Sequence, residues 1–572
     1  MTSADPLTLT FENFTYARPD IQSLTEEFNT LLSSFEQASD GETQLAVLER
    51  INALRRHFSS MYNICYVRHT ADTRDPFYDA ENQYFDQTLP AFEALNDRLY
   101  RALLASPFRE ALQQRFGAHL FTLVELALQS FTPEIISELQ QENALCSEYT
   151  RLKATALIEF EGCTYNLSSL TPIEQSNDRD TRRRASAARW AFFAKHSERF
   201  DDIFDRLVRL RHTIAKKLGA PNFISVGYAR MRRSDYNPEM VAAFRRQIRE
   251  YIVPIATQLY ERQQRRLGIE RLYYYDEDYL FPSGNPKPKG NAQELVNSAS
   301  QMYRELSAET HAFFQRMLRA HLLDLVNRDG KATGGYCTYI PAYEAPFIFS
   351  NFSGASSDVD VLTHEAGHAF QVWMSRHHDM VEYHWPTSEA AEIHSMSMEF
   401  FAWPWMHLFF GEDAEKYRFM HLNNAIRFLP YAAAVDEFQH IIYENPELSP
   451  QERKEVWQRL ERAYLPHRDY DDNVFLRAGG FWQKQSHIYN MPFYYIDYAL
   501  AQICAFQFWK RSREDAAGAW ADYVRLCRAG GSLSFLDLLR LANLRSPFED
   551  GCIQSILGEV QRYLDAVDDT AW

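Results

Sequence analysis

Most of this chain repeats apolar residues at intervals of three and four, with charged residues between them. The stretches LAVLERINALRRHFSSMYNICYV and RFDDIFDRLVRLRHTIAKKLG show the pattern clearly. This spacing places the apolar side chains on one face of an α-helix, whereas the period-two alternation of a half-buried strand is scarce. The sequence therefore predicts a mainly α fold. Strands are expected only in a hairpin that turns near Gly162, in GGYCTYIP and in APFIFSNFSG.

The length of the chain bounds its organisation. At 572 residues it exceeds the size at which a single hydrophobic core keeps growing, so we expect two or more lobes. The polar stretch TPIEQSNDRDTRRR, residues 171–184, is the best candidate for a boundary. We predict a helical N-terminal lobe with the small hairpin over residues 1–180. A second helical lobe over residues 181–572 would carry the histidine motif described next, and with it the catalytic site.

Charge and cysteine content exclude several kinds of partner. The formal net charge of −17 argues against binding to nucleic acid or to anionic lipid, which requires a basic surface. Seven cysteines without a CxxC pair predict no disulfide framework and a reducing compartment. The N-terminal residues lack the features of a secretory signal, and no apolar run approaches the length of a membrane span. We expect a cytoplasmic protein without nucleic acid or membrane partners, and the sequence leaves its oligomeric state open.

The segment VLTHEAGHAF, residues 361–370, contains an HExxH motif. On a helix, residues four apart differ by about 40° in direction and about 6 Å in height, so His364 and His368 can bind one ion. Glu365 projects about 100° away, where its carboxylate can reach a water on that ion and act as a general base. Gly367 lies inside the same helix at a cost of about 1 kcal/mol relative to Ala, which predicts close approach of a substrate or another helix.

A catalytic zinc site normally takes three protein ligands and leaves one position for water. His377 and His378 would lie about 14 to 15 Å further along the same helix, too far to share the ion. The next predicted helix, within WPTSEAAEIHSMSMEFFAWP, offers Glu392 and Glu399 on one face. We assign Glu392 as the third ligand and Glu399 as a carboxylate that accepts the free N–H of a ligand histidine. Surface glutamates remain the alternative for both, and His394 is interpreted as structural.

Attack by water on an amide also needs hydrogen-bond donors for the oxyanion that develops. The segment QKQSHIYNMPFYYIDYALAQ is dense in such groups. Its candidates are His487, Tyr489, Tyr494, Tyr495 and Tyr498. Tyr495 and Tyr498 are one helical turn apart and could face a cleft together, although aromatic stripes more often belong to a core.

Taken together, these motifs resemble the oligoendopeptidase F and thimet oligopeptidase family of zinc metallopeptidases. The resemblance rests on HEAGHAF, on Glu392 within AEIHSMSMEFF, on GGYCTY upstream and on HIYNMPFYYIDYALAQ downstream, and covers roughly residues 331–505. It implies a mostly helical, two-lobed body that encloses a deep channel, with a small sheet beside the zinc-binding helices. It further implies that APFIFSNFSG is an edge strand for pairing with the substrate backbone, and that GGYC is a loop that allows close approach.

The resemblance also implies individual roles. One Zn²⁺ per chain would be bound by His364, His368 and Glu392, with Glu365 activating the water. The substrate or its tetrahedral intermediate would be bound by His487, Tyr495 and Tyr498. The interval from His487 to the tyrosine pair is one residue shorter than in the thimet branch, so Tyr489 and Tyr494 remain rivals for these roles.

The expected function is a zinc-dependent endopeptidase that cleaves internal bonds of short, unstructured oligopeptides. A zinc exopeptidase, such as a dipeptidyl carboxypeptidase, is an alternative that would need a group to capture a free chain end. A second alternative is a catalytically silent helical protein that binds zinc or peptides. Such a structural zinc site would be closed by a fourth protein ligand, and the sequence offers no obvious one.

Overall fold

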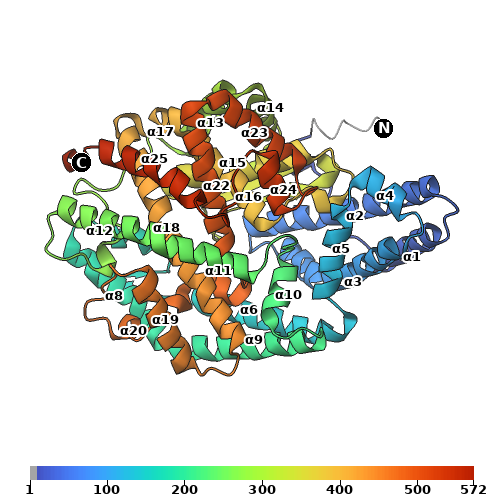
Figure 1. Cartoon of the computed structure of the whole chain (residues 1–572), viewed down its shortest axis with the longest axis horizontal. Helices are drawn as coiled ribbons and strands as arrows, with labels where there is room; N and C mark the ends of the chain where they lie inside the picture. Colours follow the sequence, from blue (N-terminus) through green and yellow to red (C-terminus); the bar gives the residue numbers. More distant parts are fainter. Residues whose placement is uncertain (1–8) are drawn as a thin grey trace.

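A computed structural model describes residues 9–572 of the chain, and helices dominate it, as predicted (Figure 1). The first helices, in blue, extend to one side of the molecule. Aspartates at 20, 40 and 75 accept hydrogen bonds from backbone N–H groups at the starts of α1, α2 and α3, which satisfies donors that a helix leaves unpaired. This region comprises α1 (Ile21–Glu36), α2 (Gly41–Ala71), α3 (Pro76–Ala105), α4 (Arg109–Phe116), α5 (His119–Ser130) and α6 (Ile136–Ala154).

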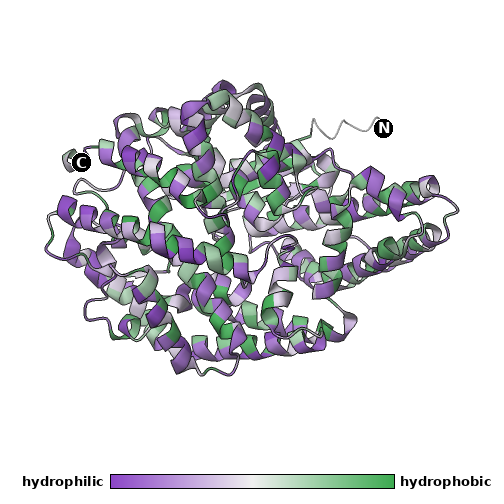
Figure 2. Cartoon of the chain, viewed as in Figure 1, coloured by the Kyte–Doolittle hydropathy of each residue, from purple (hydrophilic) through white to green (hydrophobic). Residues whose placement is uncertain are grey.

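The middle of the chain adds amphipathic helices that bury one face each. In α9, Phe200, Phe204 and Leu207 are fully buried, while the charged residues between them face solvent. Figure 2 shows the same division, with hydrophobic residues concentrated toward the interior of the molecule. These helices are α7 (Thr171–Glu174), α8 (Arg179–Lys195), α9 (Ser197–Lys217), α10 (Phe223–Arg230), α11 (Pro238–Gln247), α12 (Val253–Leu267), α13 (Ala292–Leu306) and α14 (Ala308–Arg319).

The C-terminal helices include the two that carry the predicted metal ligands, α15 and α16. Helix α16 packs against both α15 and α22, and the three lie side by side near the centre of the molecule (Figure 1). The helices are α15 (Ser357–Ser375), α16 (Ser388–Phe401), α17 (His407–Phe410), α18 (Ala414–Glu444), α19 (Pro450–Tyr464), α20 (Val474–Arg477), α21 (Ser486–Asn490), α22 (Tyr495–Glu514), α23 (Ala516–Ala529), α24 (Phe535–Leu541) and α25 (Cys552–Ala566).

The predicted hairpin is present. Strands β1 (Ile158–Phe160) and β2 (Cys163–Tyr165) pair in antiparallel fashion, and Glu161 and Gly162 form the turn, both with positive φ. The predicted boundary at residues 171–184 contains α7 and the start of α8, and the division into two lobes there stays a prediction.

A three-stranded sheet lies beside α15. It consists of β3 (Leu323–Val326), β4 (Tyr336–Ile340) and β5 (Ala345–Phe352) in the order β3-β5-β4, with β3 parallel and β4 antiparallel to β5. The expectation that APFIFSNFSG forms an edge strand is therefore wrong, because β5 is the central strand and β4 is at an edge. The first six residues of β5 are all buried, as expected for a strand with neighbours on both sides.

Two further expectations concern covalent links and membranes. All seven cysteines are free thiols, in agreement with the absence of a disulfide framework. Within residues 9–572, no helix combines the length and the apolar character that crossing a bilayer would require.

Candidate metal centre and active site

The three predicted metal ligands converge. Nε2 of His364 lies 3.3 Å and Nε2 of His368 lies 3.6 Å from Oε2 of Glu392. One ligand atom from each residue falls within 4.8 Å of the other two. Two imidazole nitrogens and a carboxylate oxygen form a donor set that suits Zn²⁺ with one position left for water. The residues present therefore fit the ion that the motif predicts.

A glycine allows α15 and α16 to approach closely enough for this arrangement. A Cβ atom on Gly367 would lie 2.6 Å from Cα of Ser395 and 2.7 Å from the carbonyl oxygen of His394. Neither backbone atom could move away without separating the helices. The prediction that Gly367 marks a close approach is confirmed, and the approaching group is the helix that carries Glu392.

A buried hydrogen-bonded chain supports His364. Its Nδ1 lies 2.7 Å from Oε1 of Glu399, and Oε2 of Glu399 lies 2.7 Å from Nε2 of His421. The indole N–H of Trp403 donates to Nδ1 of His421 at 3.3 Å, so Nε2 of His421 carries the hydrogen that Glu399 accepts. Burial opposes the charge on Glu399, but the bonds from the two histidines outweigh it and lower the pKa of Glu399. His364 therefore directs its Nε2 lone pair at the metal position.

Sequence reasoning placed Glu399 in this role but missed His421 and Trp403. Both lie beyond α16 along the chain, on α18 and on the 3₁₀ helix Trp403–Trp405. No local spacing in the sequence connects these residues to the HExxH motif, because the contact depends on how α18 packs.

Glu365 and Glu392 have opposite electrostatic environments. Burial, with Glu392 and Glu399 nearby, raises the pKa of Glu365 to about 7 despite the neighbouring His364. Burial would also raise the pKa of Glu392, but His368, His364 and a hydrogen bond from Tyr494 outweigh it and lower that pKa to about 2. A carboxylate with a pKa near 7 suits a general base, and one that stays ionised suits a metal ligand.

Four of the five predicted oxyanion candidates gather beside these carboxylates. The ring of His487 lies 5.6 Å from that of Tyr494, 5.0 Å from Tyr495 and 5.9 Å from Tyr498, measured between ring centres. The hydroxyl of Tyr494 donates to Oε1 of Glu392 at 2.7 Å. The tyrosine that the resemblance left as a rival thus contacts a predicted metal ligand directly.

His487 is held as a neutral donor. The amide Nε2 of Gln485 lies 2.8 Å from Nδ1 of His487, so this nitrogen accepts and the hydrogen resides on Nε2. Burial lowers the pKa of His487 to about 4, although Glu392 raises it, and Lys153 lowers it further. The imidazole is therefore uncharged near neutral pH and presents an N–H group.

The remaining rival, Tyr489, belongs to the core. Its ring stacks on Tyr149 with 3.9 Å between centres, and its hydroxyl donates to the carbonyl oxygen of Phe200. It is fully buried. These contacts agree with the expectation that aromatic stripes more often belong to a core.

The other histidines of the region lie elsewhere. His394 is buried against Tyr523, with 6.2 Å between ring centres, in agreement with its structural interpretation. The expectation that His377 and His378 continue the HExxH helix is wrong, because α15 ends at Ser375. His378 instead approaches the carbonyl oxygen of Arg528, at 3.1 Å from its Nε2.

The turn that leads into the tyrosines is fixed by residues from distant elements. Phe493, with φ at 69°, donates its N–H to Oε1 of Gln439 and accepts at its carbonyl from Arg233. Arg233 also donates to Asp497 in the first turn of α22, at 2.6 Å. A Cβ atom on Gly227 would lie 2.5 Å from the Phe493 ring. Residues of α10, of α18 and of the link between α10 and α11 therefore fix the start of α22. This part of the chain carries Tyr494, Tyr495 and Tyr498.

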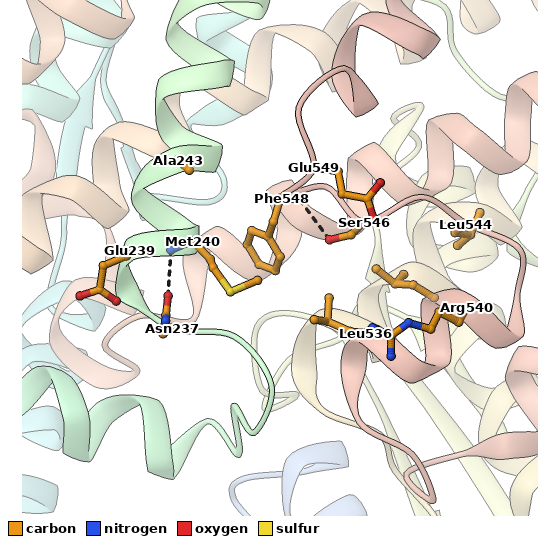
Figure 3. Close-up of a pocket in the computed structure, with 11 residues that line it drawn as sticks. Asn237, Glu239, Met240, Ala243, Leu536, Arg540, Leu544, Ser546, Phe548 and Glu549 are labelled. Atoms are coloured by element: carbon orange, nitrogen blue, oxygen red, sulfur yellow. Dashed lines mark hydrogen bonds between the residues drawn. The ribbon is translucent and has the colours of Figure 1, made fainter.

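A surface pocket of about 480 Å³ lies away from this site, between α11 and the region of α24 (Figure 3). Met240, Leu536 and Phe548 give it an apolar lining. Two of its polar side chains serve local turns: Asn237 accepts from the N–H of Met240, and Ser546 accepts from that of Phe548. The pocket contains none of the predicted site residues, so it does not compete with the metal centre as the reaction site.

Comparison with known families decides what kind of protein contains this site. A model described as peptidase family M3 matches residues 173–557, and one described as the peptidase M3 N-terminal domain matches residues 11–131. The first match alone covers more than half of the chain. The chain belongs to peptidase family M3.

Solved structures resemble this M3 peptidase over its whole length. It is 57% identical to PZ peptidase A, solved with an inhibitor, with a TM-score of 0.95 over 98% of this chain and 100% of that one. It is 56% identical to a second structure described as an oligoendopeptidase F, with a TM-score of 0.95 over 99% and 100% of the two chains. A comparison of sequences gives a further relative. The chain is 23% identical over 308 residues to the oligoendopeptidase F homolog of Borreliella burgdorferi, and this match spans 51% of this chain and 50% of that relative.

These findings confirm the family resemblance that the sequence motifs indicated. This M3 peptidase is an enzyme that acts on peptides, and it brings together a group of three residues that fits a metal ion. The roles of its individual side chains stay predictions.

Proposed function

We propose that this chain is a zinc-dependent endopeptidase that hydrolyses internal bonds of short, unstructured oligopeptides. The observation that carries the proposal is the convergence of His364, His368 and Glu392 with Glu365 beside them. Bound Zn²⁺ would supply a Lewis acid for the scissile carbonyl and lower the pKa of the attacking water. The family match supports peptide hydrolysis as the reaction class.

The side chains divide the work of the reaction. Glu365 takes a proton from the attacking water and delivers it to the leaving amine, which its raised pKa favours. Tyr498 and Tyr495 donate to the oxyanion, and His487 assists with its Nε2–H. Tyr494 holds the carboxylate of Glu392 in position.

The sheet offers a place for an extended substrate. Strand β4 lies at an edge of the sheet, because it pairs with β5 on one side and, within the described residues, with no strand on the other. Helix α15 packs beside it. Gly334, with φ at 96°, and Gly335 precede β4 in the GGYC loop. We propose that substrate backbone pairs with β4, which would favour unstructured peptides because a folded protein cannot present an extended segment. We place this activity in the cytoplasm, with oligopeptides as the partners.

The test is mass spectrometry of a random peptide pool after incubation, with and without a chelator. The proposal predicts cleavage inside peptides, loss of cleavage with the chelator, and recovery when Zn²⁺ is returned. A peptide blocked at both ends separates the exopeptidase alternative, because endopeptidase cleavage survives blocking. Failure to cleave any peptide in the pool with zinc present would overturn the proposal and favour a silent binding protein.

A further inference from the structure

Two lysines, Lys484 and Lys153, lie close to the start of the segment that carries His487. Lys484 ends the 3₁₀ helix Phe481–Lys484, directly before Gln485. Lys153, from the end of α6, donates to the carbonyl oxygen of Lys484 at 3.1 Å and to the hydroxyl of Ser486 at 2.8 Å. Each of the two residues is partly exposed as a whole.

Neither lysine forms an ion pair with any residue of the described part of the chain. The ammonium group of Lys484 contacts only ring faces, at 4.0 Å from the centre of Phe481, 5.8 Å from Trp190 and 5.9 Å from Tyr431. Within residues 9–572, the structure gives Lys484 Nζ no hydrogen bond and neither ammonium group an ion pair. Cation–π contact stabilises an ammonium group only in part.

Two arginines in the interior of this chain differ in this respect. Arg211 contacts Glu142 at 2.6 Å, and Arg233 contacts Asp497 at 2.6 Å. An unpaired buried charge is costly, so such pairing is the rule for an interior cation. Two ammonium groups without an ion pair, on residues joined by the bond from Lys153 to the Lys484 carbonyl beside a candidate active site, therefore call for an explanation.

The electrostatic surroundings make the two groups receptive to an anion. Burial and the nearby Arg468 and Arg189 lower the pKa of Lys484 to about 8. The carboxylates of Asp278 and Glu277 act in the opposite direction and offset only part of this lowering. Burial and Arg189 likewise lower the pKa of Lys153 to about 8. A substrate carboxylate beside either ammonium group would offset the repulsion that the group experiences from the nearby arginines.

A continuous series of contacts joins Lys484 to the metal group. Tyr494, which donates to the ligand carboxylate, lies against His487, and Nδ1 of His487 lies 2.8 Å from Gln485. Gln485 in turn accepts from the hydroxyl of Tyr431 at 2.9 Å, and the ring of Tyr431 faces Lys484. All five side chains are partly exposed.

We propose that Lys484 and Lys153 form a subsite that binds a carboxylate of the peptide substrate. The carboxylate is either the C-terminal group of a short peptide or the side chain of an Asp or Glu residue near the cleaved bond. This inference rests on the proposed peptidase function. It adds a preference for substrates that carry an anionic group at a fixed distance from that bond.

The first experiment compares matched peptides on the zinc-loaded wild-type enzyme. One pair differs only in a C-terminal acid or amide, and a second pair, amidated throughout, differs only in Asp or Asn at one position. A charge-assisted hydrogen bond predicts a KM about 10-fold to 100-fold lower for the acid member of one pair. Equal KM values within both pairs would overturn the subsite while leaving the peptidase function intact. Cleavage of none of the peptides would instead contradict the proposed function.

The second experiment assigns the preference to the lysines. Lys484→Met should bring the KM ratio of the discriminating pair close to one, with kcat for the neutral peptide unchanged, and Lys484→Arg should restore part of the ratio. Lys153→Met should reduce the ratio independently. Lys416→Met is the matched control, because among the described residues that lysine also forms no ion pair and contacts Phe281 and Ser283 instead. If Lys484→Met and Lys153→Met both keep the wild-type ratio, the assignment is wrong.

A thermal melt of each variant separates this role from a structural one. Removal of an unpaired ammonium group should leave the melting temperature of Lys484→Met at or above that of the wild type. A lower melting temperature together with an unchanged KM ratio would show that Lys484 serves packing over the Phe481 ring instead.

Discussion

The hydroxyl of Tyr494 lies 2.7 Å from Oε1 of Glu392, so the segment that contains the predicted oxyanion donors also contacts a predicted metal ligand. Oε2 of the same carboxylate faces the two histidines. In the proposed function, this contact divides the three tyrosines: Tyr494 would orient a metal ligand, while Tyr498 and Tyr495 would bind the substrate.

This division predicts different defects for two conservative substitutions. Tyr494→Phe should weaken zinc binding by about 10-fold to 100-fold, because it removes a hydrogen bond that orients a ligand. Tyr498→Phe should leave zinc affinity unchanged and lower kcat by about 10² to 10³, the usual loss for one oxyanion donor. Chelator competition measures the first quantity and steady-state kinetics the second. If Tyr498→Phe loses zinc while Tyr494→Phe does not, the two roles are reversed.

The contact between Gly227 and Phe493 gives a prediction far from the chemistry. Gly227→Ala introduces a Cβ atom 2.5 Å from the Phe493 ring, which must shift the turn before Tyr494. We expect kcat to fall at least about tenfold with KM and zinc content near wild type, because the oxyanion donors lose their alignment. Overpacking should also cost about 1 to 3 kcal/mol in the free energy of unfolding.

A second substitution and a control test this reason. Gly227→Ala combined with Phe493→Leu should recover part of kcat, since the smaller side chain makes room. Gly558→Ala in α25 meets no atom within 4 Å and should behave like the wild type. A wild-type kcat for Gly227→Ala would show that the turn tolerates the shift.

Much of the candidate metal centre could be predicted from the sequence, because its residues lie within two helices and their spacing along each helix decides which side chains share a face. The i, i+4 histidines, the glutamate between them and the face shared by Glu392 and Glu399 follow from helical geometry alone. Tyr494, His421 and Arg233 could not be assigned in this way. Each acts across an interface between helices that are far apart in the chain, and no spacing within one helix encodes such a contact.

The strands show the same limit. The apolar run of β5 correctly predicts a strand, and its burial on both sides is the physical sign of a central position. The edge position is implied only by the family resemblance, and the strand order contradicts it. The order of the strands depends on which side of β5 the strand β3 pairs with, and the sequence of β5 does not determine that pairing.

A buried ion pair between the N-terminal helices and the loop before α16 predicts a pH dependence of stability. Arg55 on α2 contacts Glu382, and Tyr100 on α3 donates to the same carboxylate at 2.8 Å. Burial would raise the pKa of Glu382, but Arg55 and the hydrogen bonds lower it to about 2, from an ordinary value of 4.5. A lowered pKa stabilises the fold above pH 4.5, and this contribution is lost as the pH falls toward 2.

Glu382→Gln should therefore lower the free energy of unfolding by about 3 kcal/mol at pH 7. The difference from the wild type should shrink as the pH decreases below about 4.5. Denaturant titrations of both proteins across this range measure it, with the exposed Glu412→Gln as a control. A difference that stays constant with pH would mean that the carboxylate charge does not contribute.

The central claim is that three side chains bind one zinc ion while Glu365 moves the proton. It is tested most directly by measuring the zinc content and the peptide hydrolysis of Glu365→Gln on the same sample. We predict about one zinc per chain, as in the wild type, with kcat lower by about 10² to 10⁴. Normal cleavage by this variant, or loss of its zinc, would contradict the account.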